Sequence, residues 1–167
     1  MYKILSSLLL ISVVFTSCIK KNDQCTFNTV ETSAPATEKN TLRTFLQSNA
    51  IPFTEDPHGF FYNIVTPGSG AIIANLCSTV SVTYVGKLSN GTIFDQTAAG
   101  SQAAFQLGNV IYGWQKGLPL ISKNGRILLY IPPSFGYGST AVKDNSGNVI
   151  IPANSNLFFD ITIADIK

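Results

Sequence analysis

Apolar and polar residues alternate along much of the chain after residue 58, and this two-residue period is typical of half-buried β-strands. In the last such segment Phe159, Ile161 and Ile163 share one face, while polar or small residues occupy the other. Residues 89–92 read Ser-Asn-Gly-Thr, which predicts a tight hairpin turn between two of the strands. We expect strands at residues 60–65, 80–85, 93–95, 126–131 and 157–166.

Two segments carry the spacing of a helix instead. Residues 110–122 predict a helix that Gly113, Gly117 and Pro119 keep short. A second short helix is expected ahead of the strands, with its N-cap within Thr37-Glu38-Lys39-Asn40 and its end near Asn49. Several antiparallel strands with one helix packed on a single sheet make an α+β fold.

Composition narrows the class of protein. Of 167 residues 45% are hydrophobic and 12% are charged, so the chain has enough apolar residues for one hydrophobic core, and a disordered chain is excluded. The net charge is +2 and no basic cluster is longer than Lys20-Lys21, which argues against a nucleic-acid interface. A single histidine and three cysteines argue against a zinc site, and we expect no cofactor.

The first residues resemble an export signal. Lys3 precedes an apolar run at residues 4–15, whose twelve residues would rise about 18 Å as a helix, short of a hydrocarbon core of ~30 Å. The run ends in Phe-Thr-Ser before Cys18, which resembles a bacterial lipobox and implies lipid attachment to that cysteine. The alternative is ordinary secretion with a free Cys18. We therefore expect an exported protein that is lipid-anchored at a bacterial membrane and faces the periplasm or the cell surface.

Two cysteines remain, Cys25 and Cys77. Export leads to an oxidising compartment, where thiols often pair, and a bridge here would tie the N-terminal segment to the domain. The sequence leaves both outcomes open, a Cys25–Cys77 disulfide or two unpaired cysteines. The expected organisation is a signal peptide at 1–17, a tether at 18–37, a short helix and linker at 38–57, and a domain at 58–167.

Five blocks in the domain resemble the FKBP-type peptidyl-prolyl isomerases. The first is the run Val-Thr-Tyr-Val-Gly-Lys-Leu-Ser-Asn-Gly-Thr-Ile-Phe-Asp at residues 82–95. The others follow in family order at residues 105–108, 110–118, 131–138 and 150–160. The resemblance covers about residues 80–167 and says little about residues before about 60.

The resemblance implies an antiparallel sheet half-wrapped around one short α-helix, with a pocket between them. By similarity Trp114 forms the pocket floor and the Ile111 backbone N–H faces a ligand carbonyl. The catalytic residues implied are Tyr84, Phe94, Asp95, Trp114, Tyr137 and Phe159. The substrate-binding residues implied are Val110, Ile111 and Ile151. Phe105, although inside a block, is expected in the core.

The implied activity is cis–trans isomerisation of Xaa–Pro bonds in exported proteins, which needs no nucleophile, base or metal. The expected partners are proline-containing polypeptides, macrolide ligands of the FK506 kind, and a membrane reached through the lipid anchor, with the protein a monomer. Ala103 thins the expected pocket wall, which predicts weak macrolide binding, and residues 139–149 form a long loop with a hairpin tip at 145–148. The rival function is a peptide-binding chaperone or assembly factor without turnover. A hydrolase built on Cys77, Asp95 and His58 is disfavoured, because no nucleophile motif surrounds them.

Overall fold

The structure is a computed structural model that describes residues 25–167. The predicted signal peptide at 1–17 and the predicted lipidation site Cys18 lie outside the described residues. Within the described part of the chain, no helix combines the length and the apolar character that crossing a membrane requires.

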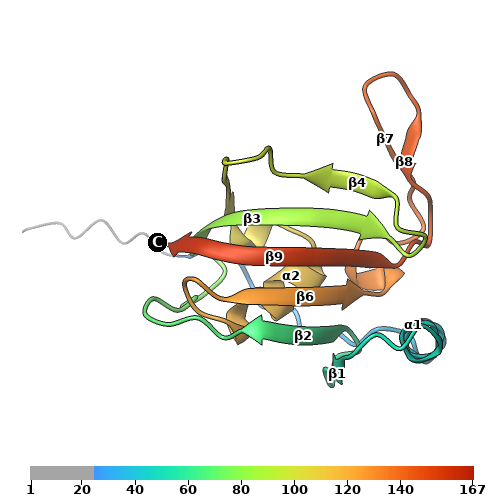
Figure 1. Cartoon of the computed structure of the whole chain (residues 1–167), viewed down its shortest axis with the longest axis horizontal. Coiled ribbons are helices and arrows are strands. Elements are labelled where there is room, and N and C mark those ends of the chain that lie inside the picture. The colour runs from blue at the N-terminus through green and yellow to red at the C-terminus, as the bar shows by residue number, and fades with distance from the viewer. Residues whose placement is uncertain (1–24) are drawn as a thin grey trace, which may run out of the picture.

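One antiparallel sheet forms the body of the domain, with strand order β1-β2-β6-β9-β3-β4 and β5 also paired with β3 (Figure 1). The two longest strands, β3 and β9, lie side by side near its middle. The five predicted strands are all present. The sheet also contains two short strands, β1 and β5, in which the alternation of residue types is too short to predict a strand. The strands are β1 (Thr54–Glu55), β2 (Phe61–Thr66), β3 (Thr79–Leu88), β4 (Ile93–Gln96), β5 (Ala103–Gln106), β6 (Arg126–Ile131) and β9 (Leu157–Ile166).

The helix α2 (Tyr112–Gly117) lies behind the sheet in Figure 1 and covers its main core face. It is shorter than the predicted 110–122, and a 3₁₀ turn, η2 (Leu118–Leu120), follows it directly. Pro119 has no backbone N–H to continue the α-helical ladder, which explains the early end. Two glycines allow close packing: a Cβ at Gly113 would lie 2.6 Å from Ile131, and one at Gly117 would lie 2.5 Å from Leu129.

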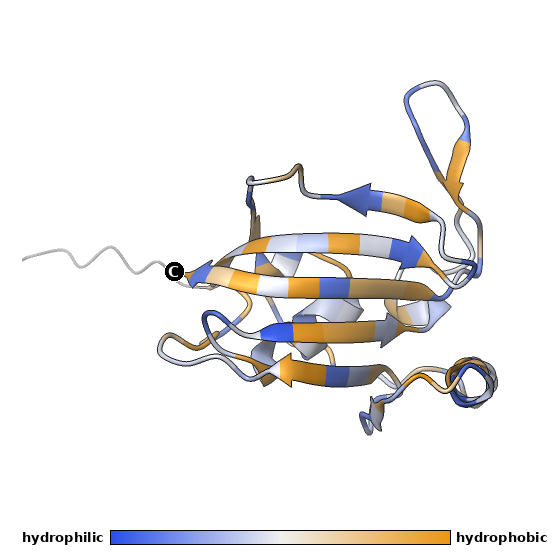
Figure 2. Cartoon of the chain, in the orientation of Figure 1, coloured by the Kyte–Doolittle hydropathy of each residue, from blue (hydrophilic) through white to orange (hydrophobic). Residues whose placement is uncertain are grey.

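The sheet is apolar on both faces at one end. On β6, Ile127 and Leu129 point into the core beneath α2, whereas Tyr130 points to the opposite face. There α1 (Ala36–Ser48) packs, with its buried Leu42 and Leu46 against the outward side chains. Along β3 and β9, by contrast, hydrophobic and hydrophilic residues alternate in Figure 2.

The N-terminal part of α1 differs from the prediction. The helix begins at Ala36, with Pro35 as its N-cap, so it starts inside the predicted tether at 18–37. The stretch 37–40, predicted to hold the N-cap, lies inside the helix. The Pro35 carbonyl accepts the Lys39 amide at 3.0 Å, and its fixed φ of −52° suits a helix start.

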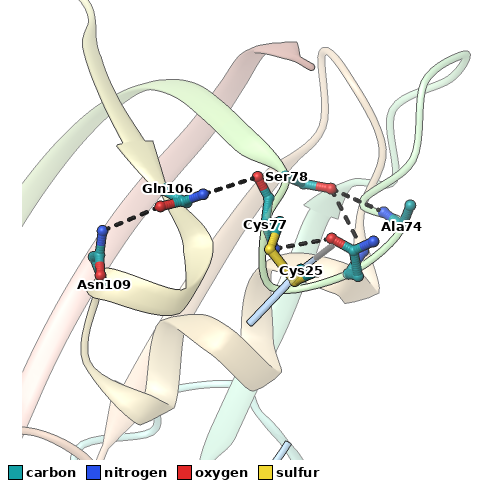
Figure 3. The surroundings of a disulfide bond; sticks show 7 residues. Cys25, Ala74, Cys77, Ser78, Gln106 and Asn109 are labelled. Carbon is teal, nitrogen blue, oxygen red and sulfur yellow. Dashed lines mark hydrogen bonds between the residues drawn. A yellow bond between two sulfur atoms is a disulfide. The ribbon is translucent and has the colours of Figure 1, made fainter. Parts of the chain in front are cut away.

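Residues 25–35, which we call the N-terminal strap, lie against the domain and so differ from a free tether. Cys25 and Cys77 form a disulfide with their Cα atoms 5.6 Å apart (Figure 3). At the other end Ala34 is buried, and its amide donates to the His58 carbonyl at 2.8 Å. The disulfide and these contacts hold in place a segment whose composition resembles a linker.

The long loop predicted at 139–149 contains a two-stranded hairpin, β7 (Val142–Lys143) and β8 (Val149–Ile151), which projects from the body in Figure 1. The predicted tip is confirmed: the Asp144 amide donates to the Asn148 carbonyl, and the Gly147 amide donates to the Asp144 carbonyl. Gly147 has a φ of +87°, a conformation that glycine adopts without strain.

Candidate functional site

A cavity of about 270 Å³ lies between α2 and the sheet, in the place where the family resemblance puts a pocket. Every predicted site residue except Ile151 lines it. The lining residues are Tyr84, Phe94, Asp95, Phe105, Asn109, Val110, Ile111, Trp114, Tyr137 and Phe159. They come from strands β3, β4, β5 and β9, from α2 with the residues preceding it, and from the segment before the β7–β8 hairpin.

Trp114 forms the aromatic centre of this pocket. Its side chain is 4% exposed, and three rings meet it edge to face: Tyr84 at 5.3 Å, Phe159 at 5.2 Å and Phe105 at 5.8 Å between centroids. Its indole Nε1 is buried and has no hydrogen-bond partner within residues 25–167. This arrangement fixes the indole in orientation and leaves a largely apolar surface facing the cavity.

The polar side of the pocket is a tyrosine–carboxylate pair. The Tyr84 hydroxyl donates to Asp95 Oδ2 at 2.5 Å. These residues lie on adjacent strands, β3 and β4, where Gly86 pairs with Asp95. Burial, followed by the hydrogen bond to Asp95, raises the pKa of Tyr84 far above its usual range, so this hydroxyl stays protonated and keeps donating.

Tyr137 lies at the rim, with 43% of its surface exposed. Burial of its inner part, followed by the negative charge of Asp95, raises the pKa of its hydroxyl above the ordinary value. The hydroxyl is therefore a proton donor throughout the neutral range and does not act as a base.

The backbone before α2 is held in place by a side chain that the sequence did not single out. Gln115 Nε2 donates to the Val110 carbonyl at 2.8 Å and to the Gly108 carbonyl at 3.3 Å. Ile111 is the N-cap residue of α2, and its carbonyl accepts the Trp114 amide at 2.9 Å. Its own N–H, just ahead of the helix, donates to no backbone carbonyl within the described part of the chain, so it can donate to a ligand carbonyl.

Three positions differ from expectation. Phe105, predicted in the core, also forms part of the pocket wall, because β5 pairs with the start of β3 and turns this ring toward Tyr84 and Trp114. Asn109 lines the rim as well, and no sequence signal had pointed to it. Ile151, predicted to bind substrate, is only 2% exposed and packs in the core instead.

The residues of the disfavoured hydrolase are not assembled. Cys77 is bonded to Cys25, and its backbone carbonyl accepts a hydrogen bond from Gln106 Nε2 at 3.4 Å (Figure 3). His58 lies against Asp56 at 2.7 Å and Glu31 at 2.9 Å, and none of these three lines the pocket. Within residues 25–167, no three His, Cys, Asp or Glu side chains are grouped as metal ligands. What the pocket offers is an apolar cup with hydroxyl donors at its edge.

Comparison with known proteins agrees with this geometry. FkpA of Buchnera aphidicola, an FKBP-type peptidyl-prolyl cis-trans isomerase, is 44% identical over 110 residues, which are 65% of this chain and 41% of that protein. A probable FKBP-type isomerase of Haemophilus influenzae is 40% identical over 110 residues, 65% of this chain and 43% of that protein. This chain thus spans about two fifths of the length of these curated relatives.

Solved structures lead to the same family. The crystal structure of Escherichia coli FkpA superposes with a TM-score of 0.66 at 33% identity, covering 79% of this chain and 60% of that one. A peptidyl-prolyl isomerase of Pseudomonas syringae gives 0.65 at 28% identity, covering 82% and 99%. Residues 70–164 match the family model described as FKBP-type peptidyl-prolyl cis-trans isomerase. The chain belongs to the family of FKBP-type peptidyl-prolyl cis-trans isomerases.

Proposed function

We propose that this protein accelerates cis–trans rotation of Xaa–Pro bonds in exported polypeptides, and that the pocket around Trp114 is its active site. The observation that carries the proposal is the pocket itself: an aromatic cup in which Trp114 is enclosed by three rings and the Tyr84–Asp95 pair stands at the side. A proline ring is compact and apolar, and a cavity of about 270 Å³ is large enough to hold it.

The chemistry suits such a cavity. Rotation about an amide crosses a barrier of ~18–20 kcal/mol, because conjugation is lost as the bond twists. No bond to carbon forms or breaks, so binding alone can act on the barrier. The twisted amide is less polar than the planar one, and an apolar pocket therefore favours it over the ground state. Lowering the barrier by ~6 kcal/mol would accelerate rotation about ten-thousand-fold.

Each side chain has a role in this scheme. The indole of Trp114 supports the prolyl ring, and the free N–H of Ile111 donates to a substrate carbonyl. The Tyr137 hydroxyl donates from the rim, since its raised pKa keeps it protonated. The Tyr84–Asp95 hydrogen bond holds the carboxylate at the pocket edge, where it interacts with the amide as its polarity changes.

We further propose that the protein is exported, is anchored to a bacterial membrane by lipid on Cys18, and acts there as a monomer on proline-containing segments. The lipobox-like sequence before Cys18 supports the anchor. Macrolides of the FK506 kind should bind the same pocket, but weakly. The reason is that β5 presents the small side chain of Ala103 two residues before Phe105, on the same side of the strand.

The test is cis-to-trans relaxation of a short Xaa–Pro peptide, followed by NMR exchange without a coupled protease. The full chain is compared with Asp95→Val and with a matched control, Asp165→Val. The control removes a carboxylate that pairs with Lys123 near the other end of β9, away from the pocket. Acceleration by the wild type and the control, and its loss in Asp95→Val, is expected. A folded wild type that does not accelerate the peptide would refute the enzyme.

A specific observation favours the second candidate, a peptide-holding chaperone. The β7–β8 hairpin projects from the body and exposes apolar side chains, with Val149 52% and Ile150 38% exposed. Peptide binding that shifts pocket resonances without any acceleration would favour this function. Deleting the hairpin would then weaken binding to an unfolded polypeptide.

A further inference from the structure

The first described helix and the N-terminal strap contact one element that carries a pocket residue, α2 with Trp114, and one that shortly precedes another, Tyr137. One contact is to Tyr112 on α2, and the other is to Ser134 in the 3₁₀ turn η3 (Pro133–Phe135). Both contacts come from residues that precede the family-matched region, 70–164. This N-terminal part therefore lies outside the family-matched region, and its effect on the pocket can be derived from its contacts.

The contact to α2 fixes the helix that supplies the pocket floor. The Tyr112 hydroxyl donates to the Val30 carbonyl at 2.9 Å and accepts the Thr32 amide at 3.3 Å. One turn later Lys116 pairs with Glu31 at 2.6 Å. Residues four apart share a helix face, whereas Trp114, halfway between them, faces the sheet. The strap thus holds α2 on the side opposite the pocket.

The contact to η3 satisfies an amide that its own turn leaves unpaired. Pro132 and Pro133 have no backbone N–H, so Ser134 carries the first N–H of this turn, and no carbonyl of the turn can accept it. Glu38, in the first turn of α1, accepts it with Oε2 at 2.9 Å across 96 residues of sequence. The turn is tied to α1 by this hydrogen bond.

The tied turn leads directly to Tyr137. The amides of Gly136 and Gly138, on either side of this residue, both donate to the Pro133 carbonyl, at 2.9 and 2.8 Å, so the position of the tyrosine follows that of the turn. The turn is held in addition by Phe135, which is buried and packs edge to face on the Tyr112 ring at 4.6 Å. Strap, α2 and η3 consequently form one connected unit on the outer side of the pocket.

We propose that Glu38 and the Tyr112 hydroxyl are positioning residues, which set the rim hydroxyl of Tyr137 relative to the floor at Trp114. The proposal rests on the proposed isomerase function. Neither positioning side chain lines the pocket. They act through Ser134 and through α2, so their removal changes the geometry of the site and leaves its chemical groups in place.

The experiment compares full-length Glu38→Ala, Glu38→Gln and Tyr112→Phe with the wild type. NMR exchange gives kcat and KM for a proline peptide. Glu38→Ala should lower kcat/KM about three- to tenfold, mostly through kcat, because the peptide still binds on Trp114. Glu38→Gln should stay close to wild type, since its amide oxygen still accepts the Ser134 N–H, and Tyr112→Phe should lose about two- to threefold.

The matched control is Glu55→Gln, which breaks the ion pair between α1 and β1 at Arg43 without any contact to the pocket. It should leave kcat and KM unchanged. Wild-type kinetics in Glu38→Ala, or an equal loss in Glu38→Gln, would overturn the positioning role.

A second readout needs no turnover and separates this proposal from the enzyme itself. In the free protein, Glu38→Ala should speed hydrogen exchange of the Ser134 amide and shift the Tyr137 ring resonances, while Glu55→Gln does neither. If the wild type proves inactive but these shifts occur, the positioning contact stands and the isomerase function fails. If Ser134 exchange and the Tyr137 signals are unchanged, the positioning contact is refuted whatever the activity.

Discussion

Replacing Trp114 by alanine tests the pocket and the core together, because this ring belongs to both. The indole is 4% exposed and touches the rings of Tyr84, Phe105 and Phe159 at 5.2–5.8 Å between centroids. The substitution removes the proposed support for the prolyl ring and a large part of the apolar surface of the pocket. Both stability and turnover should therefore fall.

The cost in stability can be worked from the surroundings. A buried indole hides about 150–250 Å², and ~25 cal/mol per Å² converts this to ~4–6 kcal/mol, an upper value. The new space would join the existing cavity of about 270 Å³, so it fills with water and the full penalty of a closed void is not added. Removing the unpaired buried indole N–H offsets a further part. We expect a loss of ~3 kcal/mol in the free energy of unfolding, or ~6–12 °C in Tm.

The matched control is Phe61→Ala, on the opposite face of the sheet. Phe61 is fully buried beneath α1 and meets the Phe53 ring edge to face at 5.2 Å. Its removal should cost ~3–5 kcal/mol, at least as much as the change at Trp114. Stability is measured by urea unfolding, and turnover by peptide relaxation at a temperature where circular dichroism shows every variant to be folded.

Turnover then separates the two variants. Trp114→Ala should lower kcat/KM per folded molecule at least about tenfold, and Phe61→Ala should leave it unchanged. An equal loss in both would mean that activity follows stability alone. Undiminished turnover in Trp114→Ala would refute the proposal that Trp114 forms the floor of the active site.

Three further outcomes follow from the same structure. Tyr137→Phe removes one half-exposed hydroxyl and should lower kcat/KM about three- to tenfold with little change in Tm; a thermal melt beside the peptide assay checks this, and unchanged turnover would remove Tyr137 from the site. Burial raises the pKa of Tyr84 and Tyr137 in the folded state, so the folded protein holds these protons more tightly than the unfolded chain. The free energy of unfolding should therefore stay level from neutral pH to pH ~10 and fall as pH rises beyond it; urea titrations across this range would contradict the reasoning if stability rose. Replacing Cys25 and Cys77 by serine opens a closed loop with a separation of 52 residues and should cost about 2–4 kcal/mol in urea unfolding, whereas an unchanged midpoint would show that the bridge contributes nothing.

The alternation of residue types was sufficient to predict the principal strands. A strand with one face in the core must repeat every two residues, and β9, with Phe159, Ile161 and Ile163 buried, shows this period over its first eight residues. The strand β5 has only four residues, too few for this period to be detected. It forms because β3 offers it a hydrogen-bonding edge. The residue at which α2 ends could be seen only in the structure, where a 3₁₀ turn that contains Pro119 follows the helix directly.

The family motifs predicted most of the residues that line the pocket. The structure brings together all of the predicted site residues except Ile151. Phe105 enters the wall because of the pairing between β5 and β3, and Ile151 is turned into the core by its place at the base of the β7–β8 hairpin. Which way a ring faces at the end of a short strand depends on its partner strand, and no local pattern contains that information.

The sequence by itself determined the properties that repeat over a few residues or stand in a compact motif: the strand periods, the hairpin turn and the family. The tertiary structure alone decided the contacts between distant segments. Glu38 meets Ser134 across 96 residues, and Cys25 reaches Cys77 across 52. Neither partner's neighbours in sequence indicate the other, because such a contact exists only after α1, the strap and the sheet have packed. The physical reason is that periodicity reflects burial of one face, whereas pairing of single side chains depends on where the whole chain returns.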